Sequence, residues 1–222
     1  MIKIVRLIGC ALLLSLSAAA TAQEAGTVMV KAGYVYFQPV VSSGTLSAPS
    51  LPGSQVNVGN ADTLLLAASY MFTDHISAEF YAGIPLKHDL YGAGSLHGVG
   101  VIGTVKHASP TLFGQYHFFE ANSNFRPYLG LGISYVRFYG ETGNAVLTAI
   151  TNPGGPGTTF SVKNTWGIAP QIGFVSWINK RLYIDFSINK AFVKSTTTLS
   201  TGQSVDTKLN PVVTQASLGY RF

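Results

Sequence analysis

The feature that most limits the possible folds is a membrane-like hydropathy without any apolar run of helix length. Only 10% of the residues are charged, and the mean hydropathy is +0.29. A membrane-spanning helix needs roughly 18 or more consecutive apolar residues, and no stretch after Ala22 approaches that length. Only helices and closed β-barrels satisfy every backbone hydrogen bond within lipid. The sequence therefore predicts an all-β transmembrane barrel.

The first 22 residues have the organisation of a secretory signal peptide. Lys3 and Arg6 give a basic start, an apolar run follows, and Ala20–Ala22 supplies a small-x-small cleavage site. We expect cleavage before Gln23. The alternative is a lipoprotein signal, because residues 7–10 (LIGC) resemble a lipobox. Most of the apolar run follows that cysteine rather than preceding it, which favours the cleaved secretory signal.

Residues 23–222 are then expected to form a single outer-membrane barrel domain. Cys10 is the only cysteine, so signal-peptide removal excludes disulfides, thiolate metal sites and a cysteine nucleophile from the mature chain. The formal net charge of +5 reflects few charges of either sign rather than a basic stripe. Nucleic acid is therefore not an expected partner.

Eight segments alternate between apolar and polar residues with a period of two, which is typical of barrel strands. In the third segment Ile76, Phe80 and Ile84 share one face, whereas Ser77 and Glu79 share the other. The eight segments are Thr27–Phe37, Thr63–Phe72, Ile76–Leu86, Ser109–Phe118, Phe125–Phe138, Ser161–Ile178, Leu182–Phe192 and Leu209–Phe222. They predict an eight-stranded antiparallel up-and-down barrel.

The connections between these segments alternate strictly between long and short. The long ones are 38–62, 87–108, 139–160 and 193–208, and the short ones are 73–75, 120–124 and 179–181. Long outer loops and short periplasmic turns give this pattern in bacterial outer-membrane barrels. We therefore expect the protein in the outer membrane of a Gram-negative cell, with both termini on the periplasmic side. The alternative, a soluble β-sandwich, does not explain the alternating loop lengths.

Several blocks of the chain resemble the OmpW family of outer-membrane proteins. They are residues 70–90 (YMFTDHISAEFYAGIPLKHDL), 103–112 (GTVKHASPTL), 125–135 (FRPYLGLGISY), 163–167 (KNTWG) and 218–222 (LGYRF). The resemblance covers nearly the whole mature chain. It implies an eight-stranded monomeric barrel linked to uptake of small hydrophobic molecules and, in some members, to colicin reception.

The resemblance also implies roles for individual residues. Tyr220 and Phe222 match a C-terminal aromatic signal that the barrel-assembly machinery reads. The positions of an apolar constriction fall near Tyr81 and Asn189, and Asn189 is a polar departure from that pattern.

Strand parity assigns a graded interior to the barrel. The outer part is expected to be an apolar funnel of Val35, Phe37, Leu65, Tyr81 and Phe113. The periplasmic part is expected to be a charged floor of Lys31, Glu79, Asp185 and Arg221. Buried opposite charges should pair, with Lys31 or Arg221 as the partner of Glu79.

This interior suits a narrow, porin-like conduit for small hydrophobic molecules. Expected partners are those solutes, outer-membrane lipids and the assembly machinery. The alternative is a structural or receptor barrel, docking a colicin or a phage, whose eight strands enclose an interior filled by side chains.

No pattern in the sequence indicates an enzyme. His88, His97 and His107 lie in the second long connection, but the chain has no nucleophile elbow, no HExxH and no ligand pair at helical spacing. We interpret these histidines as polar loop residues. We expect no catalysis, no cofactor and no metal.

Pro170 falls in the middle of the sixth predicted strand. A strand proline removes one ladder donor, which makes Pro170 a candidate lateral opening from the lumen into the membrane. The alternative is an ordinary β-bulge.

Overall fold

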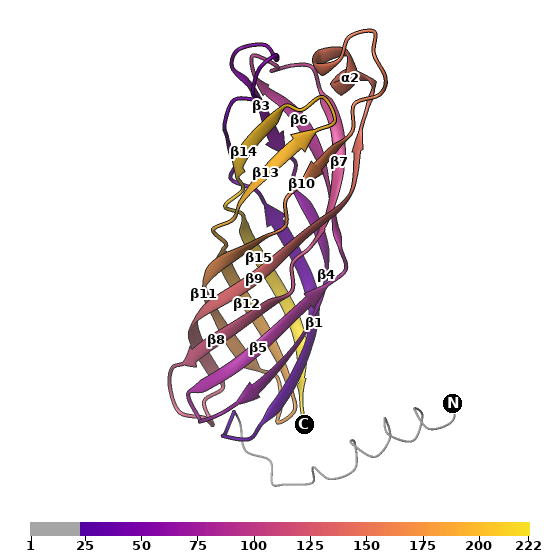
Figure 1. Cartoon of the computed structure of the whole chain (residues 1–222). Helices are drawn as coiled ribbons and strands as arrows, with labels where there is room; N and C mark the ends of the chain where they lie inside the picture. The colour runs from indigo at the N-terminus through magenta and orange to yellow at the C-terminus, as the bar shows by residue number, and fades with distance from the viewer. Residues whose placement is uncertain (1–22) are drawn as a thin grey trace, which may run out of the picture.

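The computed structural model describes residues 23–222, so the predicted signal peptide lies outside the described residues. The chain forms a tall barrel of tilted strands, with an extension of its sheet, a separate small sheet and a short helix at one end (Figure 1). The end with the long connections is called the outer end here, and the end with the short turns the inner end. Among residues 23–222, no helix is both long enough and apolar enough to cross a membrane.

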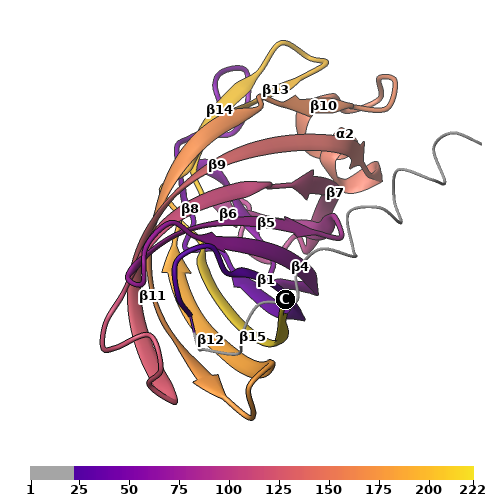
Figure 2. The ribbon, with the colours of Figure 1, turned by 90° about the horizontal axis from the view of Figure 1, so that it is seen from below.

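Eight antiparallel strands close the barrel. They are β1 (Val28–Gln38), β4 (Ala61–Met71), β5 (Ile76–Gly83), β8 (Thr111–His117), β9 (Phe125–Gly143), β11 (Thr165–Trp177), β12 (Leu182–Lys190) and β15 (Val212–Arg221). β15 pairs with β1 and β12, and β11 pairs with β12 and β9, so each of the eight has two neighbours. Figure 2 shows these strands from the inner end, where the C-terminus lies. The predicted eight-stranded barrel is confirmed.

Burial alternates along these strands with the parity that the sequence predicts. On β12 the inward side chains Tyr183, Asp185 and Ser187 are buried, whereas Ile184 and Phe186 are exposed. Large apolar side chains therefore cover the outside of the barrel and polar ones the inside. This inversion of a soluble fold is what a surface in contact with lipid requires.

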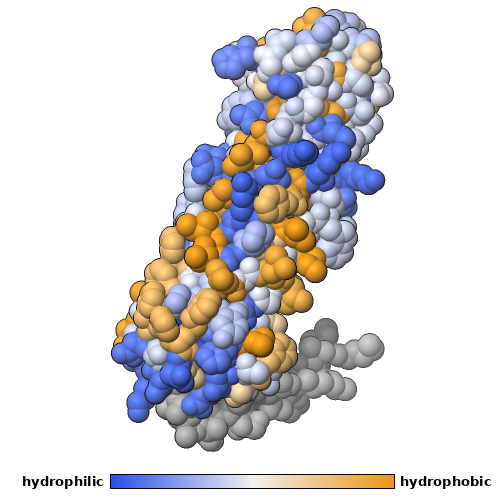
Figure 3. Space-filling view, turned by 90° about the vertical axis from the view of Figure 1, so that its left-hand side faces the viewer, coloured by the Kyte–Doolittle hydropathy of each residue, from blue (hydrophilic) through white to orange (hydrophobic). Residues whose placement is uncertain are grey.

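The outer surface carries an apolar zone bordered by aromatic residues. Figure 3 shows hydrophobic side chains spread over the middle and lower part of one face, with hydrophilic ones at the inner tip and over the outer region. Three edge-to-face ring pairs lie near the inner end: Tyr70–Phe72, Tyr116–Phe118 and Tyr220–Phe222. Rings of this kind suit the membrane interface.

The long connections are not irregular loops, as the sequence suggested. They form most of a second structured region beyond the outer end of the eight-stranded barrel; this region is called the outer storey here, and the eight-stranded part the barrel storey. The elements of the outer storey are β2 (Ser42–Ser43), β3 (Ser54–Val58), β6 (Leu86–Gly94), β7 (Val101–Ala108), α2 (Ala145–Thr151), β10 (Phe160–Val162), β13 (Lys194–Leu199) and β14 (Ser204–Lys208). β7, β6 and β3 continue the sheet from β9, and β10, β13, β14 and β2 form a separate sheet.

Prolines mark where the two storeys meet. β5 ends at Gly83 and β6 begins at Leu86, on either side of Pro85, and Pro110 separates β7 from β8 in the same way. A proline lacks a backbone donor, so it interrupts a ladder without preventing the chain from continuing outward. The walls of the barrel therefore extend beyond the eight-stranded part.

Candidate functional site

A buried ion cluster crosses the lumen in the barrel storey. The Lys31 ammonium on β1 lies 2.8 Å from a Glu79 carboxylate oxygen on β5 and 2.9 Å from one of Asp185 on β12. Each of the three side chains is at most 4% exposed. One cation therefore bridges two carboxylates from opposite parts of the sequence.

Neutral polar side chains surround this cluster and satisfy its remaining hydrogen-bonding groups. The hydrogen bonds run from Gln115 Nε2 to Glu79 Oε2 (2.7 Å), from the Tyr128 hydroxyl to Asp185 Oδ2 (3.1 Å), from Gln215 Nε2 to Asp185 Oδ1 (3.2 Å), and from the Nε2 atoms of Gln171 and Gln215 to the Tyr81 hydroxyl (both 2.8 Å). Buried charges are tolerated only when they are paired and hydrogen-bonded in this way. The ion cluster and these partners together form the polar network.

Three of the four predicted floor residues belong to the polar network, and Arg221 does not. The β1–β15 register pairs Lys31 with Gly219 and Met29 with Arg221, so Arg221 lies one inward position closer to the inner end. Its guanidinium is 5.4 Å from the centre of the Trp177 ring. The expectation that Arg221 could pair with Glu79 is therefore wrong.

An apolar layer lies between the polar network and the inner end. The sequence did not predict this layer. Met29, Met71, Tyr128, Val175 and Tyr183 pack into one buried cluster. The lumen of the barrel storey is therefore filled in two successive layers, one polar and one apolar.

At the inner end, Arg126 connects three segments of the chain through hydrogen bonds. The sequence did not identify this residue. Its side chain is fully buried and donates to the backbone carbonyl oxygens of Gln23, Asp74, Phe118 and Phe119. A single guanidinium thus holds the start of the described chain against two short turns.

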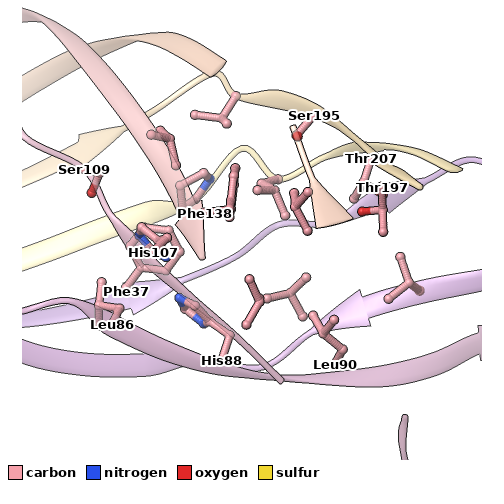
Figure 4. A pocket seen from close by; sticks show the side chains of 18 of the residues that line it. Phe37, Leu86, His88, Leu90, His107, Ser109, Phe138, Ser195, Thr197 and Thr207 are labelled. Carbon is pink, nitrogen blue, oxygen red and sulfur yellow. The ribbon is translucent and has the colours of Figure 1, made fainter. Parts of the chain in front are cut away.

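A cavity of about 200 Å³ opens above the polar network (Figure 4). All five predicted funnel residues line it: Val35, Phe37, Leu65, Tyr81 and Phe113. The Tyr81 ring packs 4.8 Å from the Phe113 ring, centre to centre, while its hydroxyl accepts hydrogen bonds from the network. Tyr81 is therefore the boundary between cavity and network. Asn189, the other predicted constriction position, also lines the cavity.

The outer storey supplies most of the cavity wall, including many residues that the sequence assigned to loops. They include Leu46, Val56, Leu90, Leu96, Ile102, Val105, Leu147, Ile150, Phe160, Leu199 and Val205. None of the described residues that line the cavity is Asp, Glu, Lys or Arg.

His88 and His107 also line the cavity, so their interpretation as polar loop residues is wrong. The two rings stack 5.0 Å apart and nearly parallel, and Phe37 contacts both. The three rings gather on one side of the cavity in Figure 4. Burial lowers the pKa of His107 to about 3 and also lowers the pKa of His88. Both imidazoles are therefore neutral at physiological pH, and the cavity wall carries no charge.

Pro170 faces outward in the middle of β11, beside an interruption in the barrel wall. The β11–β12 ladder reaches Gln171 paired with Asn189, and above it only the bridge between Ile168 and Phe192 remains. The register is the same on both sides of the interruption. The wall therefore contains a gap in its hydrogen bonding and not the β-bulge that was the alternative.

The described residues contain no group of three or more His, Cys, Asp or Glu side chains placed to hold a metal ion. The uncharged and mostly apolar cavity wall is suited to binding by apolar contact.

Comparison with known proteins gives consistent relationships. A family model described as the OmpW family matches residues 24–222. The chain is 35% identical over 219 residues to outer membrane protein W of Vibrio cholerae, with 96% of this chain and 97% of the relative covered. The crystal structure of the outer membrane protein OprG from Pseudomonas aeruginosa matches with a TM-score of 0.81 and 25% identity, covering 90% of this chain and 98% of that chain.

A more distant relative carries a name that refers to a metabolic context. The dibenzothiophene metabolism operon protein PahQ of Pseudomonas aeruginosa is 23% identical over 180 residues, which cover 80% of this chain and 79% of the relative.

Proposed function

The chain belongs to the OmpW family of Gram-negative outer-membrane β-barrels, and we propose that it takes up small hydrophobic molecules through the cavity at its outer end. The observation that carries this proposal is the uncharged wall of that cavity, which is open above the barrel and closed below by the polar network. Transfer of an apolar solute from water into such a wall is favourable. Transfer of an ion is costly, because no charged group replaces its hydration.

The route onward is lateral in this proposal. A hydrocarbon that moved along the barrel axis would have to break the hydrogen bonds of the polar network without replacing them, which costs free energy. The gap beside Pro170 offers a weaker part of the wall. On the inner side of this gap the wall carries only methyl groups. Ala169 on β11 and Ala191, which directly follows β12, are both buried. A solute would leave the cavity between these strands and enter the membrane.

The relationship to PahQ supports a hydrophobic solute for this chain. Its name refers to dibenzothiophene, which is an uncharged aromatic compound of the chemical class that an uncharged apolar cavity favours. The solute itself is not specified by this relationship.

The second candidate function is a structural or receptor barrel that docks a colicin or a phage at its outer end. The filled barrel storey favours it, because the polar network and the apolar layer below it leave the axis closed. A receptor barrel requires no solute flux, so transport measurements separate the two functions.

The test is flux of a neutral apolar solute into liposomes that contain the protein, compared with protein-free liposomes. Leu90→Asp places a charge in the cavity wall, and Tyr91→Asp places the same charge on the adjacent, outward-facing position of β6. We expect the parent and Tyr91→Asp to accelerate flux and Leu90→Asp to do so much less. Flux at the protein-free level for a folded parent would reject transport and favour the receptor barrel.

A further inference from the structure

The exterior of the outer storey carries a basic patch, formed by Lys87 on β6, Lys106 on β7 and Arg137 on β9. All three side chains are exposed. The strands are consecutive in one sheet. Lys87 pairs directly opposite Lys106, and Arg137 pairs opposite Ala108, two residues along β7 from Lys106. The three cations are therefore neighbours on one face.

The basic patch begins where the lipid-facing apolar rows end. On β9 the outward residues Leu131 and Ile133 are exposed, Tyr135 follows them, and Arg137 is the next outward position. Each such step along a strand is about 7 Å. Lys87 likewise follows the exposed Ile84 at the junction of β5 and β6. The patch therefore lies at the level of the lipid head groups on the outer side of the membrane.

Among the described residues, no carboxylate is paired with the basic patch, although Asp89 is the next outward residue of β6 after Lys87. Like charges directly opposite each other on a sheet are destabilising, and the Lys87–Lys106 pair is one such case. A second such pair, Lys194 opposite Lys208, is relieved by the Asp206 carboxylate 3.0 Å from the Lys194 ammonium. Among residues 23–222 no carboxylate forms an ion pair with a member of the basic patch. The repulsion therefore calls for an external anion.

Cations are denser here than on the barrel strands elsewhere. The outward rows of β1 and β4 end at their outer ends in Gln38 and Asp62, and that of β12 ends in the single cation Lys190. A charge needed only for solubility would not be concentrated on three neighbouring strands. The concentration favours a bound molecule at one place on the circumference.

We propose that the basic patch binds the phosphate groups of a lipopolysaccharide molecule in the outer leaflet. Phosphate attached to a lipid is the anion available at head-group level beside an apolar surface. A guanidinium and two ammonium groups at neighbouring positions match it, because charge-assisted hydrogen bonds to phosphate are the strong ones. Such a lipid would neutralise the Lys87–Lys106 repulsion while its acyl chains cover the apolar rows below.

Binding to the purified, folded protein in detergent tests the proposal, with lipopolysaccharide, the same lipid after removal of its phosphates, and inorganic phosphate as probes. We expect the phosphorylated lipid to bind at least about tenfold more tightly than the dephosphorylated one. The variant K87Q/K106Q/R137Q should lose that preference. K180Q/K194Q/K208Q removes the same charge elsewhere and should retain it. A triple patch variant that binds like the parent would overturn the proposal, and so would inorganic phosphate competing as well as the lipid.

Thermal stability gives a second readout that does not depend on ligand affinity. In detergent without lipopolysaccharide, Lys106→Glu should raise the melting temperature, because it places an opposite charge against Lys87. In the same variant, added lipopolysaccharide should no longer stabilise the protein as it stabilises the parent. A lower melting temperature for Lys106→Glu, or stabilisation by the lipid equal to that of the parent, would contradict the repulsion that the proposal rests on.

Discussion

The barrel storey and the outer storey continue the same inward-facing rows of side chains but use them differently. In the barrel storey these positions carry Lys31, Glu79 and Asp185, whose polar network spans the lumen. In the outer storey they carry apolar residues such as Leu86 and Val105, around a cavity of about 200 Å³. Eight strands leave an interior that side chains can just fill. Additional strands, rather than a wider barrel, enclose the cavity here.

The largest loss of stability should follow the replacement of Lys31 by Met in the barrel storey. This change leaves Glu79 and Asp185 buried without their cation, and loss of one partner from a buried ion pair costs about 3–5 kcal/mol. Glu79→Gln is the matched control, because Lys31 keeps Asp185 at 2.9 Å and the loss should stay below about 2 kcal/mol. Urea unfolding of both variants in lipid vesicles measures this. Equal losses would mean that the cation does not hold the network together.

A second prediction concerns how tightly the barrel storey is filled. A methyl group on Gly219 would overlap the ring of Tyr183, whereas one on Gly114 would meet nothing within 4 Å. Gly219→Ala should therefore destabilise the protein by about 1–3 kcal/mol, which is the usual effect of overpacking. Gly114→Ala serves as the control in the same urea titration. If Gly219→Ala unfolds like Gly114→Ala, the apolar layer has more free space than the structure indicates.

The outer storey should respond to acid because of His107. Burial lowers its folded-state pKa to about 3, and the unfolded value is about 6.5. Below pH 6.5 the unfolded state binds more protons, so stability falls as the pH falls toward 3. Between pH 8 and pH 5.5 the loss should be about 1.4 kcal/mol.

Hydrogen exchange of β6 and β7 at several pH values measures that loss. His107→Phe should remove most of it. Replacement of the exposed His97 by Asn should leave the parent profile unchanged, and an identical profile in all three proteins would contradict the assignment to His107.

The smallest effect on stability, and a large one on transport, is expected at Pro170. Pro170→Val restores a backbone donor opposite β12, so the ladder can close. The free energy of unfolding should change by no more than about 0.5 kcal/mol, as for other surface positions. The flux of an apolar solute should fall. Ile172→Val, two positions along the same outward face, is the control. Unchanged flux in a folded Pro170→Val variant would exclude this gap as the exit.

Much of the barrel storey can be predicted from the sequence, because a lipid-facing strand must alternate. Residues such as Ile184 and Asp185 could be assigned to opposite faces by parity alone. Height along the barrel could not be assigned in this way. The stagger between strands sets it, and it depends on pairings distant in sequence, such as Lys31 with Gly219. Arg221 was therefore placed on the correct face but at the wrong level.

The outer storey was harder to predict for a different reason. His88 and Leu90 alternate with Lys87 and Asp89, which is a strand pattern, but the glycines and serines within residues 87–108 favour a loop. A neutral imidazole tolerates burial far better than a charged group does. The sequence therefore did not distinguish a histidine in an apolar cavity from one in solvent. Nor could it show that the interruption at Pro170 lacks the register shift of a bulge.

The most direct test of the central contrast is the reactivity of single cysteines on either side of the polar network. The only cysteine in the sequence, Cys10, lies outside the described residues. Val35 lines the cavity and Val175 lies in the apolar layer below the network, so Val35→Cys and Val175→Cys place one thiol on each side of the network. A small, neutral, apolar maleimide added from the outer side should modify position 35 at least about tenfold faster than position 175, a ratio that a difference of 1.4 kcal/mol produces. A sulfonated maleimide should react slowly with both. Equal rates at the two positions, or equal rates for the two reagents at position 35, would contradict an uncharged cavity above a closed barrel.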